Sequence, residues 1–183
     1  MSIARGQLID NRIIVWDIEE SRRLFGFGYY GKPLGISKPK GIDFDSPLIL
    51  DLIEGLYLLD NSFLIIFKEN SRRITTTQII SRCKKEYIDF EFKYIVFEYL
   101  RDKGYVVSPG VKFGCDFAVY ERGPGIDHAP YLVQVYKPKE NFSATQMVLA
   151  GRLATTVKKQ FIIAIPNLKD KEVEFIAFDW WKA

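Results

Sequence analysis

The chain has 183 residues, of which 48% are hydrophobic, 15% aromatic and 27% charged. This composition is sufficient for a folded core and excludes an intrinsically disordered chain. The 26 basic and 23 acidic residues give a net charge of only +3. Bulk charge therefore decides nothing about nucleic-acid binding, which must be argued from where the basic residues cluster.

Membrane and metal-binding classes are also disfavoured. No apolar run approaches the length of a membrane span, and the N-terminus lacks the apolar core of a signal peptide. Cys83 and Cys115 are far apart and outside any metal-ligand spacing, so each is interpreted as a small buried hydrophobe. We therefore expect a soluble, cytoplasmic protein without a membrane segment.

The first half of the chain is predicted to form a small mixed α/β domain over residues 1–86. Asp10 and Asn11 separate two short apolar runs, which predicts a hairpin. The other expected elements are a helix capped by Asp17, a helix over 48–59 that starts at Ser46–Pro47, a strand over 63–67, and a helix after the capping box Thr75–Gln78. None of these elements carries a catalytic pattern.

Between Phe25 and Phe44, glycines alternate with tyrosines and lysines. This composition predicts a long exposed loop. One interpretation is a solvated connection. The other is a basic arm in which Lys32, Lys38 and Lys40 contact RNA phosphates while the tyrosines stack on unpaired bases.

The second half, residues 87–183, is predicted to form a mixed sheet flanked by helices. Its expected helices run from Phe90 to a stop at Gly104, and from the capping box Ser143–Gln146 to about Lys158. Short β-rich runs are expected at 105–107, 112–113, 116–120, 131–136, 161–165 and 173–178. The fold class is therefore α+β or α/β, in two small domains.

Three side chains in the second half suggest a chemistry. His128 is the only histidine of the chain and lies in a Gly/Pro-rich segment typical of a loop. Tyr120 precedes it by eight residues, and Lys159 follows at the end of the last predicted helix. A phenol, an imidazole and an ammonium without an acidic cluster indicate acid–base phosphoryl chemistry that needs no metal or other cofactor.

Four motifs resemble the catalytic half of the archaeal tRNA-intron splicing endonucleases. They are Gly104-Tyr-Val-Val, Lys112-Phe-Gly-Cys-Asp116-Phe-Ala-Val-Tyr120, Asp127-His128-Ala-Pro-Tyr131-Leu-Val and Arg152-Leu-Ala-Thr-Thr-Val-Lys-Lys159. A weaker likeness to that family's N-terminal domain continues over Leu52-Ile-Glu-Gly-Leu-Tyr57-Leu. The resemblance thus covers most of the chain.

This resemblance implies an active site made of Tyr120, His128 and Lys159. The implied reaction is metal-independent cleavage of precursor tRNA at bulge-helix-bulge sites, leaving a 2',3'-cyclic phosphate and a 5'-hydroxyl. In our hypothesis, Tyr120 helps to remove the 2'-proton, His128 protonates the departing 5'-oxygen, and Lys159 stabilises the phosphoryl charge. A tyrosine with a reference pKa near 10 is only about 0.1% ionised at pH 7, and a nearby ammonium would favour the phenolate.

The resemblance also implies RNA contacts and an assembly. Arg152 lies seven residues before Lys159, so on a continuous helix both would share a face, and the family uses an arginine there to clamp a bulged base. The long loop is similar to that of crenarchaeal catalytic subunits, which pair with a structural subunit in an α2β2 assembly. A homodimer or homotetramer is the alternative, although Lys169 and Lys171 dilute the acidic docking loop of homotetrameric members.

Two rival functions remain open at this point. A restriction-type DNA nuclease would need Asp116 and a second acidic residue two positions before Lys137 to hold Mg²⁺, but that position is Val135. A non-catalytic structural subunit of the same complex would have no need to keep Tyr120, His128 and Lys159 together. The sequence therefore favours the catalytic subunit.

Overall fold

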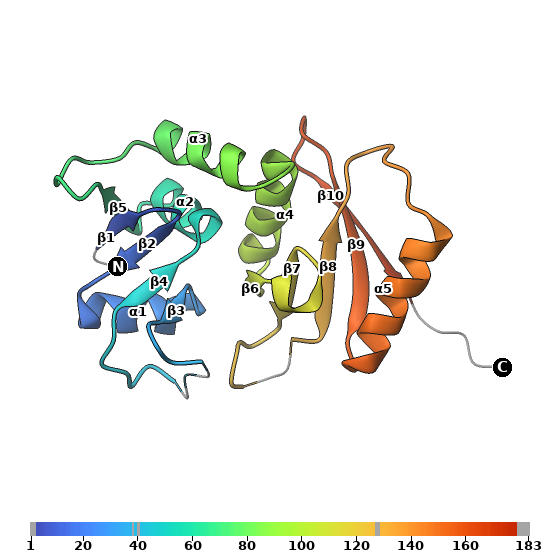
Figure 1. The fold of residues 1–183 in the computed structure, drawn as a ribbon, viewed down its shortest axis with the longest axis horizontal. Helices are drawn as coiled ribbons and strands as arrows, with labels where there is room; N and C mark the ends of the chain where they lie inside the picture. The colour runs from blue at the N-terminus through green and yellow to red at the C-terminus, as the bar shows by residue number, and fades with distance from the viewer. Residues whose placement is uncertain (1–2, 38, 40, 127–128, 179–183) are drawn as a thin grey trace. The chain divides into compact units, whose positions relative to one another are not determined.

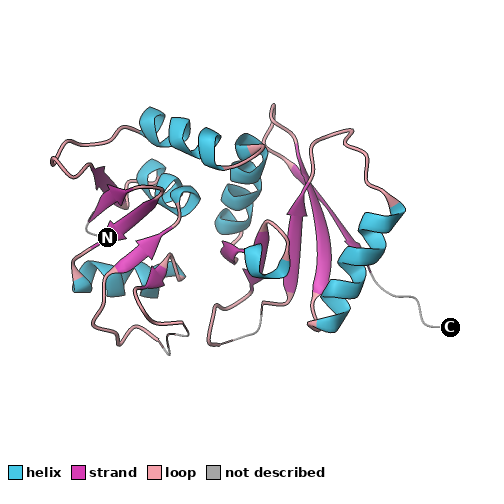
Figure 2. Ribbon diagram, in the orientation of Figure 1, coloured by secondary structure: helices cyan, strands magenta, loops and turns pink. Residues whose placement is uncertain are grey.

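The computed structural model describes residues 3–37, 39, 41–126 and 129–178. The chain divides into two compact units, residues 1–90 and 91–183, and each contains a five-stranded mixed sheet (Figures 1 and 2). The expected mixed α/β class with two domains is confirmed. The boundary predicted at 86/87 stays a prediction. Within the described ranges, no helix is both long and apolar enough to cross a membrane.

The sheet of the N-terminal unit has the strand order β3-β4-β2-β1-β5, and only β1 and β5 pair in parallel. Its strands are β1 Ala4–Ile9, β2 Arg12–Val15, β3 Lys32–Pro33, β4 Leu48–Leu50 and β5 Leu64–Phe67. Its helices are α1 Ile18–Gly28, α2 Leu52–Asp60 and α3 Thr76–Glu86. Ile9 pairs with Arg12, so Asp10 and Asn11 form the predicted two-residue turn.

Two of the predicted helix starts are confirmed. The Asp17 side chain accepts a hydrogen bond from the Glu20 N–H at 2.8 Å. Thr75 and Gln78 form the reciprocal bonds of a capping box at the start of α3. These side chains satisfy backbone N–H groups that have no partner inside the helix.

The helix predicted from Ser46–Pro47 starts later than expected. Leu48–Leu50 form a strand that pairs with β2, and α2 begins only at Leu52. The true start is a capping box in which Asp51 accepts from the Ile53 N–H, while Glu54 accepts from the Asp51 N–H at 2.9 Å. Burial of β4 in the sheet overrode the helical spacing of its leucines.

The segment from Phe25 to Phe44 is less exposed than predicted. Its first residues complete α1, and Phe25, Tyr30 and Phe44 are each at least 95% buried. Gly31 has a φ of +71°, and a Cβ there would lie 2.7 Å from the Ile49 carbonyl oxygen, so glycine lets the chain approach β4. The short strand β3 follows. Apart from α1 and β3, the described part of the segment contains no helix or strand.

The sheet of the C-terminal unit has the order β10-β9-β8-β7-β6, with β8 and β9 parallel and the other pairs antiparallel. Its strands are β6 Val106–Pro109, β7 Phe117–Tyr120, β8 Tyr131–Val135, β9 Gln160–Pro166 and β10 Val173–Phe178. Helices α4 Phe90–Asp102 and α5 Ala144–Thr156 cover opposite faces (Figure 1). Gly104, at φ +88°, ends α4 as predicted.

The run Lys112–Phe113 is not a strand, contrary to prediction. It belongs to a 3-10 turn, η1 Val111–Phe113. The Gly110 carbonyl accepts from the N–H groups of Phe113 at 2.8 Å and Cys115 at 3.3 Å. These local bonds close the turn between β6 and β7, so its backbone is not available for sheet pairing.

The face of the sheet that α5 covers has its own hydrophobic core, here called the α5-face cluster. Its buried members are Cys115, Ala118, Ala129, Leu132, Ala154, Phe161 and Ile163. Phe113 and Tyr120 are half-buried and pack against it. Side chains alternate between faces along a strand, so Val119 and Val133 lie on the α4 face.

We expect both cysteine thiols to be unreactive in the folded protein. Burial, and then the neighbouring aspartates, raises the pKa of Cys83 to about 12 and that of Cys115 to about 11, from an ordinary 9.0. Because the thiolate is the reactive species, both thiols stay protonated and inert at pH 8. A disulfide reagent should modify native protein much more slowly than urea-unfolded protein. Equal rates would contradict this expectation.

Candidate active site

The strand register brings three chain segments to one end of the C-terminal sheet. Val119 of β7 pairs with Tyr131 of β8, and Tyr131 pairs with Gln160 of β9. The end of β7 therefore lies beside the start of β8, which lies beside the start of β9. Tyr120, the chain before β8 and Lys159 all come from these positions.

Tyr120 is the last residue of β7. It is half-buried and packs against the α5-face cluster, on the same side of the sheet as Ala118. Its side chain therefore lies on the face of the sheet that α5 covers.

Helix α5 ends at Thr156, two residues before the predicted end at about Lys158, and Lys159 lies outside the helix. The Lys159 N–H donates to the Ala154 carbonyl at 2.8 Å, and the Lys158 N–H donates to the Thr155 carbonyl at 3.1 Å. With Lys158 at φ +55°, this is a Schellman motif with a lysine at the left-handed position. The argument that Arg152 and Lys159 share a helix face therefore fails.

The Lys159 ammonium is held on two sides. It donates a hydrogen bond to the Ala129 carbonyl oxygen, and its Nζ lies 5.3 Å from the centroid of the Phe113 ring. The first partner is a backbone carbonyl and the second an aromatic ring, which together fix the position of a flexible side chain. Phe113 was not predicted as a site residue, because its contact with Lys159 joins segments that are far apart in the sequence.

Two of the remaining predicted site residues, Arg152 and Lys32, belong to the described part of the chain. Arg152 is exposed on α5, and Lys32 is exposed on the edge strand β3 of the N-terminal unit. His128, Lys38 and Lys40 lie outside the described residues. In sequence, His128 directly precedes Ala129, which is 2% exposed and accepts the Lys159 hydrogen bond.

Asp116 is occupied by structural contacts. Its carboxylate pairs with the Lys93 ammonium at 2.7 Å, and it accepts hydrogen bonds from the Gln134 amide at 2.6 Å and the Val135 N–H at 2.8 Å. The side chain is 10% exposed. Asp116 therefore joins α4 to β8 and is poorly placed to hold the Mg²⁺ of a restriction-type site. Within the described ranges, no three His, Cys, Asp or Glu side chains gather as metal ligands.

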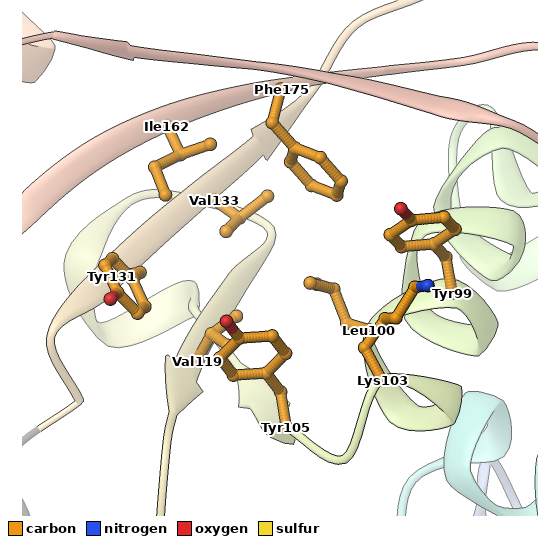
Figure 3. A pocket seen from close by; sticks show the side chains of 9 residues that line it. All are labelled: Tyr99, Leu100, Lys103, Tyr105, Val119, Tyr131, Val133, Ile162 and Phe175. Atoms are coloured by element: carbon orange, nitrogen blue, oxygen red, sulfur yellow. The ribbon is translucent and has the colours of Figure 1, made fainter.

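A pocket of about 520 Å³ opens on the opposite, α4 face of the sheet (Figure 3). Tyr99 of α4 and Phe175 of β10 lie close together in it, with ring centroids 5.5 Å apart, and Val119, Val133 and Tyr131 line it from β7 and β8. A hydrogen bond from the Tyr131 hydroxyl to Glu121 raises the pKa of this phenol. Tyr120 and Lys159 do not line this pocket, so it is separate from the candidate active site.

Comparison with known proteins identifies the class. The model of the tRNA intron endonuclease N-terminal domain matches residues 4–80, and that of the tRNA intron endonuclease catalytic C-terminal domain matches residues 90–175. The chain thus combines both domains of one class of nuclease.

Full-length relatives agree. The tRNA-splicing endonuclease of Hyperthermus butylicus is 45% identical over 178 residues, covering 97% of this chain and 98% of that protein. Those of Sulfurisphaera tokodaii and Saccharolobus solfataricus are 41% and 37% identical, covering 97% and 98% of this chain and 98% and 100% of theirs. The chain belongs to the tRNA intron endonuclease family, as its motifs predicted.

The Schellman motif before Lys159 makes a testable prediction. A left-handed conformation costs a residue with a Cβ about 1–2 kcal/mol, and β-branching makes it worse. Lys158→Gly should therefore raise the free energy of unfolding by up to about 1 kcal/mol, whereas Lys158→Val should lower it by about 1–2 kcal/mol. Urea unfolding measures both changes. A Val variant as stable as the Gly variant would show that Lys158 does not adopt this conformation.

Proposed function

We propose that this protein is the catalytic subunit of a tRNA-splicing endonuclease, which cuts precursor tRNA at bulge-helix-bulge sites. The observation that carries the proposal is the meeting of Tyr120, Lys159 and the chain before β8 at one end of the sheet. His128 is joined directly to Ala129, whose carbonyl accepts from the Lys159 ammonium.

The proposed reaction uses the nucleophile of the RNA itself. The substrate 2'-oxygen attacks the adjacent phosphorus and loses its proton, while the bond from phosphorus to the 5'-oxygen breaks and that oxygen gains a proton. The products are a 2',3'-cyclic phosphate and a 5'-hydroxyl, and no water is consumed. Two proton transfers and stabilisation of phosphoryl charge are all that the protein must supply, so no metal or cofactor is required.

Each of the three side chains suits one of these tasks. Histidine, with a reference pKa near 6.5, is a good general acid near neutrality, and His128 would protonate the leaving 5'-oxygen. Tyr120 would help to remove the 2'-proton. Lys159, held by Phe113 and the Ala129 carbonyl, would present a fixed positive charge to the phosphoryl oxygens.

The flanking RNA would meet the basic residues outside the site. Arg152 is exposed on α5, where its planar guanidinium could stack on an unpaired base of a bulge. Lys32, Lys38 and Lys40 would contact backbone phosphates, which position the RNA without reading its sequence. These four residues remain proposals for RNA binding.

We also propose that β10, the strand at one edge of the C-terminal sheet, pairs with another subunit. β10 is an outermost strand, and it leaves Phe175 and Ile176 39% and 45% exposed. A free strand edge with apolar side chains favours isologous pairing with another subunit. The self-docking loop of a homotetramer is less favoured, because Asp170 bonds within its own turn and Lys171 pairs with Glu98 at 3.0 Å. An α2β2 assembly with a structural subunit fits both features.

His128→Ala tests the catalytic assignment. Loss of a general acid should lower the single-turnover cleavage rate of a bulge-helix-bulge RNA by a factor of about 100 or more. RNA affinity and the thermal unfolding midpoint should stay close to wild type. Unchanged cleavage would remove His128 from the mechanism. RNA binding by a wild-type chain that does not cleave even when the proposed partner subunit is added would favour the alternative of a non-catalytic subunit.

A further inference from the structure

Two ammonium groups lie over one aromatic ring beside the candidate active site. The Nζ atoms of Lys159 and Lys112 are 5.3 Å and 5.7 Å from the centroid of the Phe113 ring. We propose that Phe113 positions both cations for the RNA backbone, and that Lys112 binds a phosphate next to the one being cleaved. The inference rests on the proposed function, because it concerns the same RNA at the same end of the sheet.

The turn that carries Phe113 is well anchored. Hydrogen bonds from Phe113 and Cys115 to the Gly110 carbonyl close it, and the Gly110 N–H donates to the Asp116 carbonyl at 2.8 Å. Below the ring lies the α5-face cluster, against which Phe113 packs. The ring is therefore a fixed surface, and a cation placed over it loses less freedom when it meets an anion.

The charge distribution favours an anionic ligand. Lys112 is exposed, and its ring contact is the one interaction that the described part of the chain gives its ammonium. Two like charges around one ring repel each other, and an anion near both would relieve that repulsion. A phosphodiester backbone supplies such anions at regular spacing along the RNA.

The two lysines differ in what they would do. Lys159 is half-buried and held by the Ala129 carbonyl, which suits a charge fixed at the reacting phosphate. Among the described residues Lys112 has no such second anchor, and its exposed side chain suits a sequence-independent backbone contact. Lys112 should therefore contribute to affinity, and Phe113 should contribute to both affinity and rate.

Lys103 provides a matched control for Lys112. It is also an exposed lysine of the C-terminal unit with its ammonium over one ring, 5.5 Å from the Tyr99 centroid. However, it belongs to the α4 face, where it lines the pocket of Figure 3. Replacing either lysine by glutamine removes the same charge from opposite faces of the sheet.

The first test is RNA binding at several salt concentrations. The probe is a bulge-helix-bulge RNA with 2'-deoxynucleotides at the cleavage sites, which removes the attacking hydroxyl. Lys112→Gln should weaken binding severalfold and reduce the slope of log affinity against log salt by about 1. Lys103→Gln should leave the slope unchanged. Equal slopes for wild type and Lys112→Gln, or equal losses in both variants, would overturn the phosphate contact.

The second test separates positioning from packing. Phe113→Tyr keeps the aromatic face, whereas Phe113→Leu keeps an apolar side chain without it. Phe113→Leu should lower kcat on the cleavable RNA by about 10- to 100-fold, whereas Phe113→Tyr should keep kcat close to the wild-type value. A folded Leu variant with wild-type kcat would overturn the positioning role.

Failure of the proposed function would look different. In that case the wild-type chain, supplied with its structural subunit, would not cut the cleavable RNA at all. The slope difference between Lys112→Gln and Lys103→Gln would still report whether Lys112 binds phosphate.

Discussion

The candidate active site depends on the parallel pairing of β8 with β9. Parallel neighbours cannot be joined by a hairpin, so the chain must cross the sheet and return to the end where β8 began. Helix α5 makes that crossing, and its Schellman motif ends it directly before Lys159. The start of β9 is thereby set beside Ala129 and Pro130, with the Gln160 N–H donating to the Pro130 carbonyl at 2.8 Å. A phenol at the end of β7 completes the same edge.

The two faces of this sheet have different tasks. One face carries an aromatic pocket and helix α4, whose Lys93 forms an ion pair with Asp116. On the other face, which α5 covers, lie Tyr120, Phe113 and the contacts of Lys159. Because the Asp116 carboxylate is used to join α4 and β8, the site has ammonium groups and a phenol but no free carboxylate from that residue. Such a site suits charge stabilisation on a phosphoryl group and proton transfer, rather than binding of a divalent cation.

Local signals in the sequence predicted much of the fold. Asp17, the Thr75–Gln78 and Ser143–Gln146 boxes, and Gly104 mark helix ends through bonds to residues a few positions away, so they can be found without knowing the fold. Leu48–Leu50 was misassigned because its burial comes from pairing with β2, which is a long-range contact. The contacts of Lys159 were missed for the same reason, since Phe113 and Ala129 meet it only through sheet register.

The most direct measurement is cleavage of a bulge-helix-bulge RNA in EDTA by the protein together with the proposed structural subunit, with the 3'-ends of the products analysed. Attack by the 2'-hydroxyl, supported by Tyr120, His128 and Lys159, predicts undiminished cleavage and a 2',3'-cyclic phosphate. Cleavage that is lost on chelation, or products ending in a free 3'-hydroxyl, would contradict this mechanism and point to a metal-activated water.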